Sequence, residues 1–456
     1  MALKAAFHNL GCRVNAYETE AMIEQLKRAG YELVPFDAGA DIYVVNTCTV
    51  THIADRKSRQ MLHRAREWNP HAIVIAVGCY VEDAGEALIR DGAVDLMIGN
   101  HAKSRLAEIL ARYMAGSPET VYTEPIQNVK HYDELSISET EGRTRAFLKI
   151  QDGCNQFCSY CMIPYVRGRA RSRRPEEVLR EAERLARAGY RELVLTGIHV
   201  SSYGIDFSPE KGRRQTPDAS EAVTNRELLH LFRGIAAIPD VKRLRFGSLE
   251  PGIMTEEFVQ ELARNGKLCP QFHLSLQSGC DATLRRMKRK YNTKSYEAIC
   301  RRLRSAFPDP AISTDVIVGF PGESEEEFEE SYAFVERMQF SGTHIFKYSV
   351  RRGTAAAKMP GQVAEEDKAR RSDRMIALGK EASRRYAERF QGRMVEVLFE
   401  EQKQAEGMSL NSGHSKEALE VLCETEEPLS GQIWICRVQE VRPDVKAEVS
   451  LERRLY

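Results

Sequence analysis

Two stretches of the chain alternate short apolar runs with longer amphipathic segments. In the first, about residues 4–114, the apolar runs predict strands and the charged segments between them predict helices. Strands that are nearly all apolar and spaced by helices are typical of a parallel sheet covered on both faces. We therefore expect an N-terminal α/β domain over residues 1–115. Its strands are expected at residues 5–7, 42–45 and 73–77, and its helices at 19–29 and 54–68.

The second stretch, residues 142–375, repeats this alternation over a longer span. Six β/α units are fewer than the eight that close a (β/α)8 barrel, so the pattern predicts an open or partial (β/α)6 barrel. Its strands are expected at residues 146–150, 192–196, 243–247, 272–276, 312–318 and 343–348, and its helices begin near Pro175, Asn225, Thr255, Ser295 and Ser324.

The remaining segments have different patterns of hydrophobic and polar residues. Residues 116–141 are polar with Gly116 and Pro118, which predicts a linker, and residues 207–222 are expected to form an exposed loop. Residues 363–389 are strongly charged with periodic apolar positions, which predicts a helical connector. Short alternating segments in residues 390–456 predict a small all-β module.

Length and charge narrow the class of protein. The 456 residues correspond to about three domains. Lys plus Arg and Asp plus Glu both number 66, so nucleic acid would have to be held by a local basic patch rather than by net charge. No run of 18 apolar residues exists, and the first residues lack the apolar core of a secretory signal. We expect a cytoplasmic protein without a membrane partner.

The cysteines indicate metal chemistry. The chain has 11 of them, an odd number in a large chain, which favours a reducing compartment over a disulfide framework. Cys154, Cys158 and Cys161 form a Cys-x3-Cys-x2-Cys run directly after a predicted strand. A structural zinc site requires four protein ligands, and no fourth Cys or His lies near this run in the sequence. A [4Fe-4S] cluster held by three thiolates leaves one iron open to a small chelating ligand.

A second group of cysteines is spread along the first domain. Cys12, Cys48 and Cys79 each follow a predicted strand, at intervals of about one βαβ unit. The carboxyl ends of parallel strands share one edge of the sheet, where ligands bind. We therefore expect these three thiols to hold a second cluster, with burial in the core as the alternative. The other five cysteines are interpreted as packing residues: Cys269, Cys280, Cys300, Cys423 and Cys436.

These motifs carry a resemblance. The run ending in Tyr160-Cys161 resembles the radical S-adenosylmethionine (SAM) signature. With the three upstream cysteines and the β module downstream, nearly the whole chain resembles the methylthiotransferases, which have an N-terminal cluster domain, a radical SAM partial barrel and a C-terminal TRAM domain. Further matches lie at residues 167–169, 171–173, 318–323 and 348–354. Within the family, residues 10–15 and 276–281 most resemble the branch that modifies N6-threonylcarbamoyladenosine in tRNA.

The resemblance implies a reaction and its cofactors, namely two [4Fe-4S] clusters and SAM. SAM bound at the Cys154/Cys158/Cys161 cluster would be cleaved to a 5′-deoxyadenosyl radical that takes hydrogen from carbon 2 of the adenine. A methylated sulfur from the second cluster would replace that hydrogen. The implied partners are tRNA, an electron donor such as a flavodoxin or ferredoxin, and a sulfur source. The alternatives are methylthiolation of isopentenyladenosine or of a ribosomal-protein aspartate, and a non-catalytic iron–sulfur RNA-binding sensor.

Other contacts are less sharply indicated. The carboxylate of the substrate's threonylcarbamoyl arm would suit Arg13, Arg351 or Arg352. In the β module, Phe399 and Trp434 are candidates for stacking on bases, with core packing as the alternative. For SAM, polar groups and glycines at expected strand ends are candidates: Tyr160, Thr196, Gly197, His199, Ser201, Gln277, Asp315, Gly319 and Gly322. For RNA phosphates, the candidates are five arginines after the cysteine run, with a solvated or ion-paired face as the alternative: Arg167, Arg169, Arg171, Arg173 and Arg174.

Overall fold

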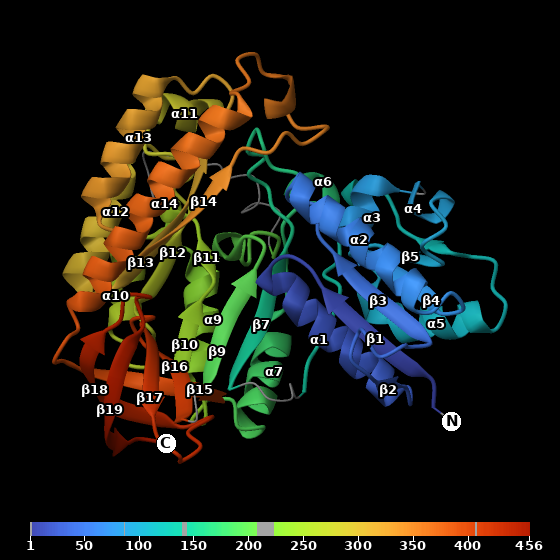
Figure 1. Ribbon diagram of the computed structural model, residues 1–456, viewed down its shortest axis with the longest axis horizontal. Helices are drawn as coiled ribbons and strands as arrows, with labels where there is room; N and C mark the ends of the chain where they lie inside the picture. Colours follow the sequence, from blue (N-terminus) through green and yellow to red (C-terminus); the bar gives the residue numbers. More distant parts are fainter. Residues whose placement is uncertain (1, 86, 139–143, 208–222, 406–407) are drawn as a thin grey trace.

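The computed structural model describes residues 2–85, 87–138, 144–207, 223–405 and 408–456. Figure 1 shows an N-terminal α/β domain in blue beside a larger α/β barrel in green to orange, with a small β-barrel in red at one end of the larger barrel. Apart from Phe207, the loop expected at 207–222 lies outside the described residues. In the part of the chain that is described, no helix is both long and apolar enough to cross a membrane.

The N-terminal domain has a parallel sheet, as predicted. Its strand order is β2-β1-β3-β4-β5-β6, and every neighbouring pair is parallel. The strands are β1 (Lys4–Asn9), β2 (Glu32–Leu33), β3 (Ile42–Thr47), β4 (Ile73–Gly78), β5 (Leu96–Ile98) and β6 (Val121–Tyr122). The helices are α1 (Arg13–Arg28), α2 (His52–Trp68), α3 (Cys79–Ala84), α4 (Ala87–Arg90) and α5 (Leu106–Met114).

The segment expected as a linker is part of the packed structure. Strand β6 pairs with β5 and extends the sheet past residue 115. Farther along, Leu135 and Ile137 are buried in the same apolar cluster as the barrel strands. Because Tyr17 of α1 also belongs to that cluster, the two domains share one core. Leu135 and Ile137 are too few apolar residues in a polar stretch to predict this packing from the sequence.

The partial barrel is confirmed and consists of two four-stranded sheets, ordered β10-β9-β7-β8 and β11-β12-β13-β14. The chain passes from the first sheet to the second between β10 and β11, where Leu244 also bridges Leu268. Only β8 is antiparallel to its neighbour. The strands are β7 (Arg145–Asp152), β8 (Arg171–Ser172), β9 (Glu192–Gly197), β10 (Arg243–Phe246), β11 (Ser248–Leu249), β12 (Gln271–Leu274), β13 (Ala311–Val318) and β14 (Gly342–Lys347).

The barrel helices begin where polar capping residues stand. The side chains of Asn225, Thr255 and Ser324 each accept a hydrogen bond from a backbone N–H in the first turn of the helix that follows. Asn292 and Ser295 form a reciprocal capping box. The helices are α6 (Ile163–Val166), α7 (Pro175–Arg187), α9 (Arg226–Ala237), α10 (Glu256–Ala263), α11 (Asp281–Arg286), α12 (Thr293–Ala306) and α13 (Glu325–Met338).

The expected helical connector is α14 (Glu365–Glu388), which packs against β14 and so covers the barrel. Its buried Met375 and Leu378 belong to the barrel core, so the helix that begins in the barrel continues past residue 375. The C-terminal module is a closed barrel, ordered β15-β16-β17-β19-β18. Its strands are β15 (Met394–Ala405), β16 (Met408–Ser415), β17 (Glu420–Glu424), β18 (Ile433–Val441) and β19 (Ala447–Arg454).

The small barrel docks at the amino-terminal end of β9 and β10 through buried charges. Glu192 accepts hydrogen bonds from Arg245 and forms an ion pair with Arg243 at 2.8 Å. The same two guanidinium groups donate to the backbone oxygens of His414 and Ser415 at 3.2 Å. The TRAM-like barrel therefore closes the floor of the larger barrel and leaves the carboxyl ends of its strands open (Figure 1).

Candidate active site between two cysteine loops

The Cys154–Cys161 segment is a tight loop at the carboxyl end of β7. The Cys161 N–H donates to the Cys158 oxygen at 3.0 Å, and the Gln156 N–H lies 3.4 Å from the Cys154 Sγ. Gly153 has φ +70°, and a Cβ at that position would lie 2.0 Å from the Arg169 oxygen. Only glycine allows the chain to enter the loop at this point.

An arginine holds one sulfur of this loop. The Arg289 Nη1 lies 3.2 Å from the Cys158 Sγ, while its Nη2 donates to both carboxylate oxygens of Glu250 at 2.8 and 2.9 Å. Burial raises the pKa of the Cys154 and Cys161 thiols to about 12. Burial by itself disfavours the thiolate form, so ligation at these positions requires that iron displace the thiol protons. Glu250 and Arg289 are functional candidates that the sequence analysis missed.

The three N-terminal cysteines lie at one edge of the parallel sheet, after β1, β3 and β4. Cys12 precedes the first turn of α1, Cys48 follows β3 and Cys79 begins α3. The loop of Cys12 approaches Cys48 closely, since a Cβ at Gly11 would lie 2.9 Å from the Cys48 Sγ, and all three thiols are near enough to influence one another electrostatically. Burial, followed by the neighbouring Cys79, raises the pKa of Cys48 to about 11. The predicted convergence of these three positions at the sheet edge is therefore present.

A cavity of about 240 Å³ lies between the two loops. One wall comes from the N-terminal sheet edge, one from the cysteine loop of the barrel and one from the carboxyl ends of β12, β13 and β14. It contains a thiol from each loop, Cys79 and Cys161. The further lining residues used below are Tyr160, Gln277, Asp315, Tyr348 and Arg351.

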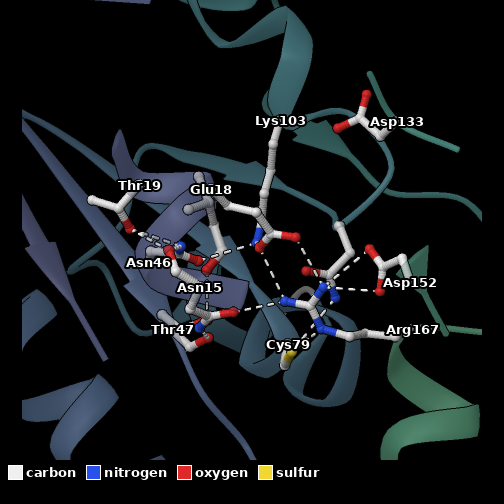
Figure 2. A network of polar contacts seen from close by, with 12 residues as sticks. Asn15, Glu18, Thr19, Asn46, Thr47, Cys79, Lys103, Asp133, Asp152 and Arg167 are labelled. Atoms are coloured by element: carbon white, nitrogen blue, oxygen red, sulfur yellow. Dashed lines mark hydrogen bonds and ion pairs between the residues drawn. The ribbon is translucent and has the colours of Figure 1, made fainter. Parts of the chain in front are cut away.

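A network of buried charges stands beside this cavity (Figure 2). Arg167 donates to Glu18 at 2.9 Å and to Asp152 at 3.0 Å. Lys149 joins the same two carboxylates at 2.6 and 2.8 Å, and Lys103 pairs with Glu18. Although burial raises the pKa of Glu18, Arg167 and the two lysines hold it well below its ordinary value. The network ties α1 of the first domain to β7 of the second.

The predicted phosphate-binding run of arginines is wrong for three of its five members. Arg167, Arg171 and Arg173 are buried, because the interior offers them carboxylates or backbone oxygens. Arg169 and Arg174 are exposed and lie over the rings of Phe157 and Phe207. Those last two are the members that remain available for RNA.

The SAM candidates divide into three groups. Tyr160, Gln277 and Asp315 line the cavity. The second group is at the end of β9 and does not line the cavity. The His199 N–H donates to Gln151 at 2.7 Å. The His199 Nε2 lies 3.7 Å from Glu250, which in turn contacts Arg289. Ser201 accepts from the Glu250 N–H, and Thr196 and Gly197 end β9.

The expected flat glycine contact with adenine is not where the structure places Gly319 and Gly322. A Cβ at Gly319 would lie 2.3 Å from the Lys368 side chain, and one at Gly322 would lie 3.4 Å from Arg286. Neither glycine is among the cavity-lining residues. Their positive φ angles serve the turn between β13 and α13, a use that the sequence motif alone did not distinguish from a ligand contact.

The candidates for the substrate carboxylate also separate. Arg351 lines the cavity, but its guanidinium already pairs with Asp55 at 2.6 Å and Asp83 at 3.1 Å. It therefore fastens the two domains together. Arg13 and Arg352 are exposed, and no ion pair joins either to another described residue. In the small barrel, Phe399 is a core residue, whereas Trp434 is half-buried with its Nε1 donating to Gln432.

Comparison with known proteins agrees with this geometry. Residues 148–335 match the radical SAM superfamily and residues 4–99 match uncharacterized protein family UPF0004. The threonylcarbamoyladenosine tRNA methylthiotransferase MtaB of Bacillus subtilis is 39% identical over 94% of this chain and 92% of its own length. The Aquifex aeolicus MtaB is 37% identical over 88% of this chain and 93% of its own. The tRNA-2-methylthio-N(6)-dimethylallyladenosine synthase of Mycobacteroides abscessus is 34% identical over 85% of this chain and 75% of its own.

Solved structures agree on the fold. The radical SAM methyltransferase TsrM from Kitasatospora setae, with tryptophan and a SAM analogue bound, superposes with a TM-score of 0.54 at 16% identity, over 76% of this chain and 73% of its own. Membership of the radical SAM superfamily implies SAM and a [4Fe-4S] cluster as cofactors. Together with the identity over most of the length of the MtaB relatives, this shows that the chain belongs to the methylthiotransferase family of radical SAM enzymes.

Proposed function

We propose that this protein is a tRNA methylthiotransferase that converts N6-threonylcarbamoyladenosine beside the anticodon into its 2-methylthio derivative. The observation that carries the proposal is the cavity whose wall contains thiols of both cysteine loops, Cys79 and Cys161. A reaction that joins sulfur to a carbon radical needs the source of the radical and the source of the sulfur close to the same adenine. A cavity between the two cysteine loops offers that arrangement.

The residues present fit two [4Fe-4S] clusters, one on Cys154, Cys158 and Cys161 and one on Cys12, Cys48 and Cys79. Each group offers three thiols and has a guanidinium nitrogen 3.2 Å from one sulfur, Arg289 at Cys158 and Arg167 at Cys79. Cationic donors of this kind favour thiolates over thiols. When bound, these groups supply the radical from SAM and the sulfur that is transferred.

The protein's own residues position the substrate and exclude water. Tyr160 packs edge-to-face on Phe320, which packs in turn on Tyr348, and this aromatic stack forms an apolar part of the cavity wall. Gln277, which follows β12 and has φ +69°, adds a polar side chain to the cavity wall. Arg351, held by Asp55 and Asp83, keeps the first domain against the barrel mouth.

Arg13 is the proposed partner of the threonylcarbamoyl carboxylate. It is the first residue of α1, next to Cys12, and α1 packs against β7 and β9. Although part of its side chain is exposed to solvent, the surrounding protein desolvates the guanidinium and lowers its pKa, and the nearby Arg145 and Arg245 lower it further, with Glu192 opposing them. An unpaired cation among like charges is a favourable place for a carboxylate. The isopentenyl branch, whose substrate arm is apolar, would not use it.

The test is turnover of anticodon stem-loop RNA by the full chain, reconstituted anaerobically with iron, sulfide, reductant and SAM. One RNA carries N6-threonylcarbamoyladenosine and a matched RNA carries N6-isopentenyladenosine. We expect the 2-methylthio product on the first alone, identified by nucleoside mass spectrometry. Product on the isopentenyl RNA alone would overturn the substrate assignment and keep the reaction type.

The assignment of the two loops is tested in the same assay. Replacing Cys12, Cys48 and Cys79 with Ala is expected to halve the iron content and stop methylthiolation, while 5′-deoxyadenosine still forms from SAM. Replacing Cys154, Cys158 and Cys161 is expected to abolish SAM cleavage. Full iron content in the first variant would contradict the N-terminal cluster.

A further inference from the structure

Arg167 lies between the two cysteine loops and contacts groups from both (Figure 2). Its Nε lies 3.2 Å from the Cys79 Sγ, and its Nη2 donates to the Asn15 Oδ1 at 2.6 Å. Its Nη1 donates to Asp152, two residues before Cys154. Asp152 also accepts the Gly153 N–H at 2.8 Å, so its carboxylate belongs to the entry of the second loop. One fully buried side chain thus joins a sulfur of one loop to the backbone of the other.

The charges around Arg167 leave a surplus of positive charge next to that sulfur. Among the six charged side chains that contact one another here, four are cations (Lys103, Lys149, Arg167 and Arg171) and two are carboxylates (Glu18 and Asp152). Each lysine already contacts a carboxylate, whereas the Arg167 Nε faces the Cys79 sulfur. Burying more cations than carboxylates is costly, and an anionic thiolate at Cys79, facing the one Arg167 nitrogen that contacts no carboxylate, would offset the excess charge.

Hydrogen bonds to ligand sulfurs tune an iron–sulfur cluster. A donor withdraws electron density from the thiolate and thereby raises the reduction potential of the cluster. Cys79 has two candidate donors, the Arg167 Nε and, at 3.7 Å, the Asn100 Nδ2. Asn100 is itself fixed by donating to the Val166 oxygen, one residue before Arg167. Both donors therefore come from ordered, buried positions.

We propose that Arg167 is a positioning residue for the sulfur-donating cluster: it hydrogen-bonds the Cys79 ligand, raises the reduction potential of that cluster and fixes it against the Cys154 loop. This inference rests on the second cluster that the proposed function places on Cys12, Cys48 and Cys79. A positioning role explains why this arginine is withdrawn from the RNA-facing surface, where the sequence run had placed it.

The other loop supplies a crossed control. A guanidinium nitrogen of Arg289 lies 3.2 Å from the Cys158 Sγ, the same distance as between Arg167 and the Cys79 Sγ. Arg289 is also paired with a carboxylate, that of Glu250. Substituting either arginine disturbs a buried ion pair, but only one cluster in each case loses its donor. Lys103 offers a second control, because it pairs with Glu18 in the same network and its nitrogen contacts oxygen atoms only.

The experiment measures the midpoint potential of each cluster by EPR-monitored redox titration in the full chain. In the Cys154/Cys158/Cys161→Ala background only the N-terminal cluster remains. There, Arg167→Lys, which retains the charge and loses the planar fork, is expected to shift the midpoint to more negative values. Arg289→Lys and Lys103→Arg, which both keep the positive charge and alter no donor to Cys79, are expected to leave it unchanged. In the Cys12/Cys48/Cys79→Ala background only the cluster on Cys154, Cys158 and Cys161 remains. There, Arg289→Lys is expected to shift the midpoint potential, and Arg167→Lys is expected to leave it unchanged.

Asn100→Leu is a milder second variant that leaves every charge of the network in place. It is expected to shift the N-terminal midpoint in the same direction by a smaller amount, and it decides the question if Arg167→Lys does not fold. An unchanged midpoint in the folded variants, with about four irons still bound, would overturn the role of Arg167. Absence of iron in the first background would instead overturn the second cluster, and with it the proposed function.

Discussion

At the scale of single residues, the site is distinguished by what each cation contacts. Arg167, Arg289 and Arg351 are buried against carboxylates, and the pairs of Arg167 and Arg351 cross the junction of the two domains. Arg13 stands among other cations without a carboxylate of its own. A buried, paired guanidinium fixes structure, whereas an unpaired one is free to bind a ligand. The residue-scale predictions concern that difference.

Arg13→Gln is expected to weaken use of the threonylcarbamoyl substrate. Loss of a charge-assisted hydrogen bond of about 1.5–3 kcal/mol corresponds to a KM increase of about 10- to 100-fold, with kcat little changed. The matched control is Arg28→Gln at the other end of the same helix, where the exposed side chain pairs with Glu24. An analogue RNA whose arm lacks the carboxylate should be used equally by both variants. Equal KM increases in the two variants would contradict the assignment.

Asp133 gives a pH-dependent prediction. Burial raises its pKa from 3.8 to about 6, against the hydrogen bonds from Ser104 and the charge of Lys149. The folded protein therefore holds more protons than the unfolded chain between about pH 4 and 6, so this group's contribution to stability falls as the pH rises through that window. Asp133→Asn is expected to gain thermal stability over the native chain at pH 7 and to lose that advantage at pH 4. Exposed Asp37→Asn serves as the control.

At the scale of elements, the ends of the parallel strands position the two groups of cysteines. Strands β1, β3 and β4 bring their cysteines to one edge, and β7 enters its loop through Gly153, whose φ is +70°. Strand β8, of two residues, turns the chain back beside β7 and directs Arg171 and Arg173 inward. The geometry of the cysteine loop therefore depends on the turn between β7 and β8.

Gly153→Ala tests that turn. A Cβ would meet the Arg169 oxygen at 2.0 Å, so the loop must shift, and we expect loss of the iron held by Cys154, Cys158 and Cys161 together with loss of SAM cleavage. Gly189→Ala is the control, with φ +101° and no atom within 4 Å, and should cost only the left-handed strain of about 1–2 kcal/mol. Similar iron content in the two variants would show that the clash is relieved without moving the loop.

The sequence predicted what depends on local pattern and missed what depends on distant partners. The cysteine positions and the strands before them follow from apolar runs and spacing, and the helix starts at Asn225, Thr255 and Ser324 follow from capping chemistry. The five clustered arginines suggested an RNA surface, because Glu18, the partner of Arg167, lies 149 residues away. No periodicity reveals such a pair.

At the scale of the whole molecule, the first two domains enclose the cavity, and buried charges join all three domains. Arg351 closes the first domain onto the barrel, and Arg243 and Arg245 reach into the small β-barrel. The small barrel is therefore a structural part of the enzyme as well as the proposed RNA-binding module. This changes what its removal is expected to do.

Deletion of residues 393–456 is expected to lower both RNA affinity and the thermal stability of the remaining domains. The two arginines lose backbone acceptors at 3.2 Å, each lost charged hydrogen bond costing roughly 1.5–3 kcal/mol. The contrasting variant is Glu400→Gln, which removes the partly exposed pair with Arg145 and should change the melting temperature little. An unchanged melting temperature after the deletion would show that Glu192 alone satisfies both guanidinium groups.

The docking of the small barrel has a consequence for the order in which a newly made chain matures. Arg243 emerges from the ribosome 171 residues before His414, the residue whose oxygen it binds. A nascent chain that has completed all six β/α units still lacks the acceptors that close the floor of the barrel. The catalytic domain therefore keeps two buried cations only partly paired until residues 393–456 have been translated, so its final assembly comes late in synthesis.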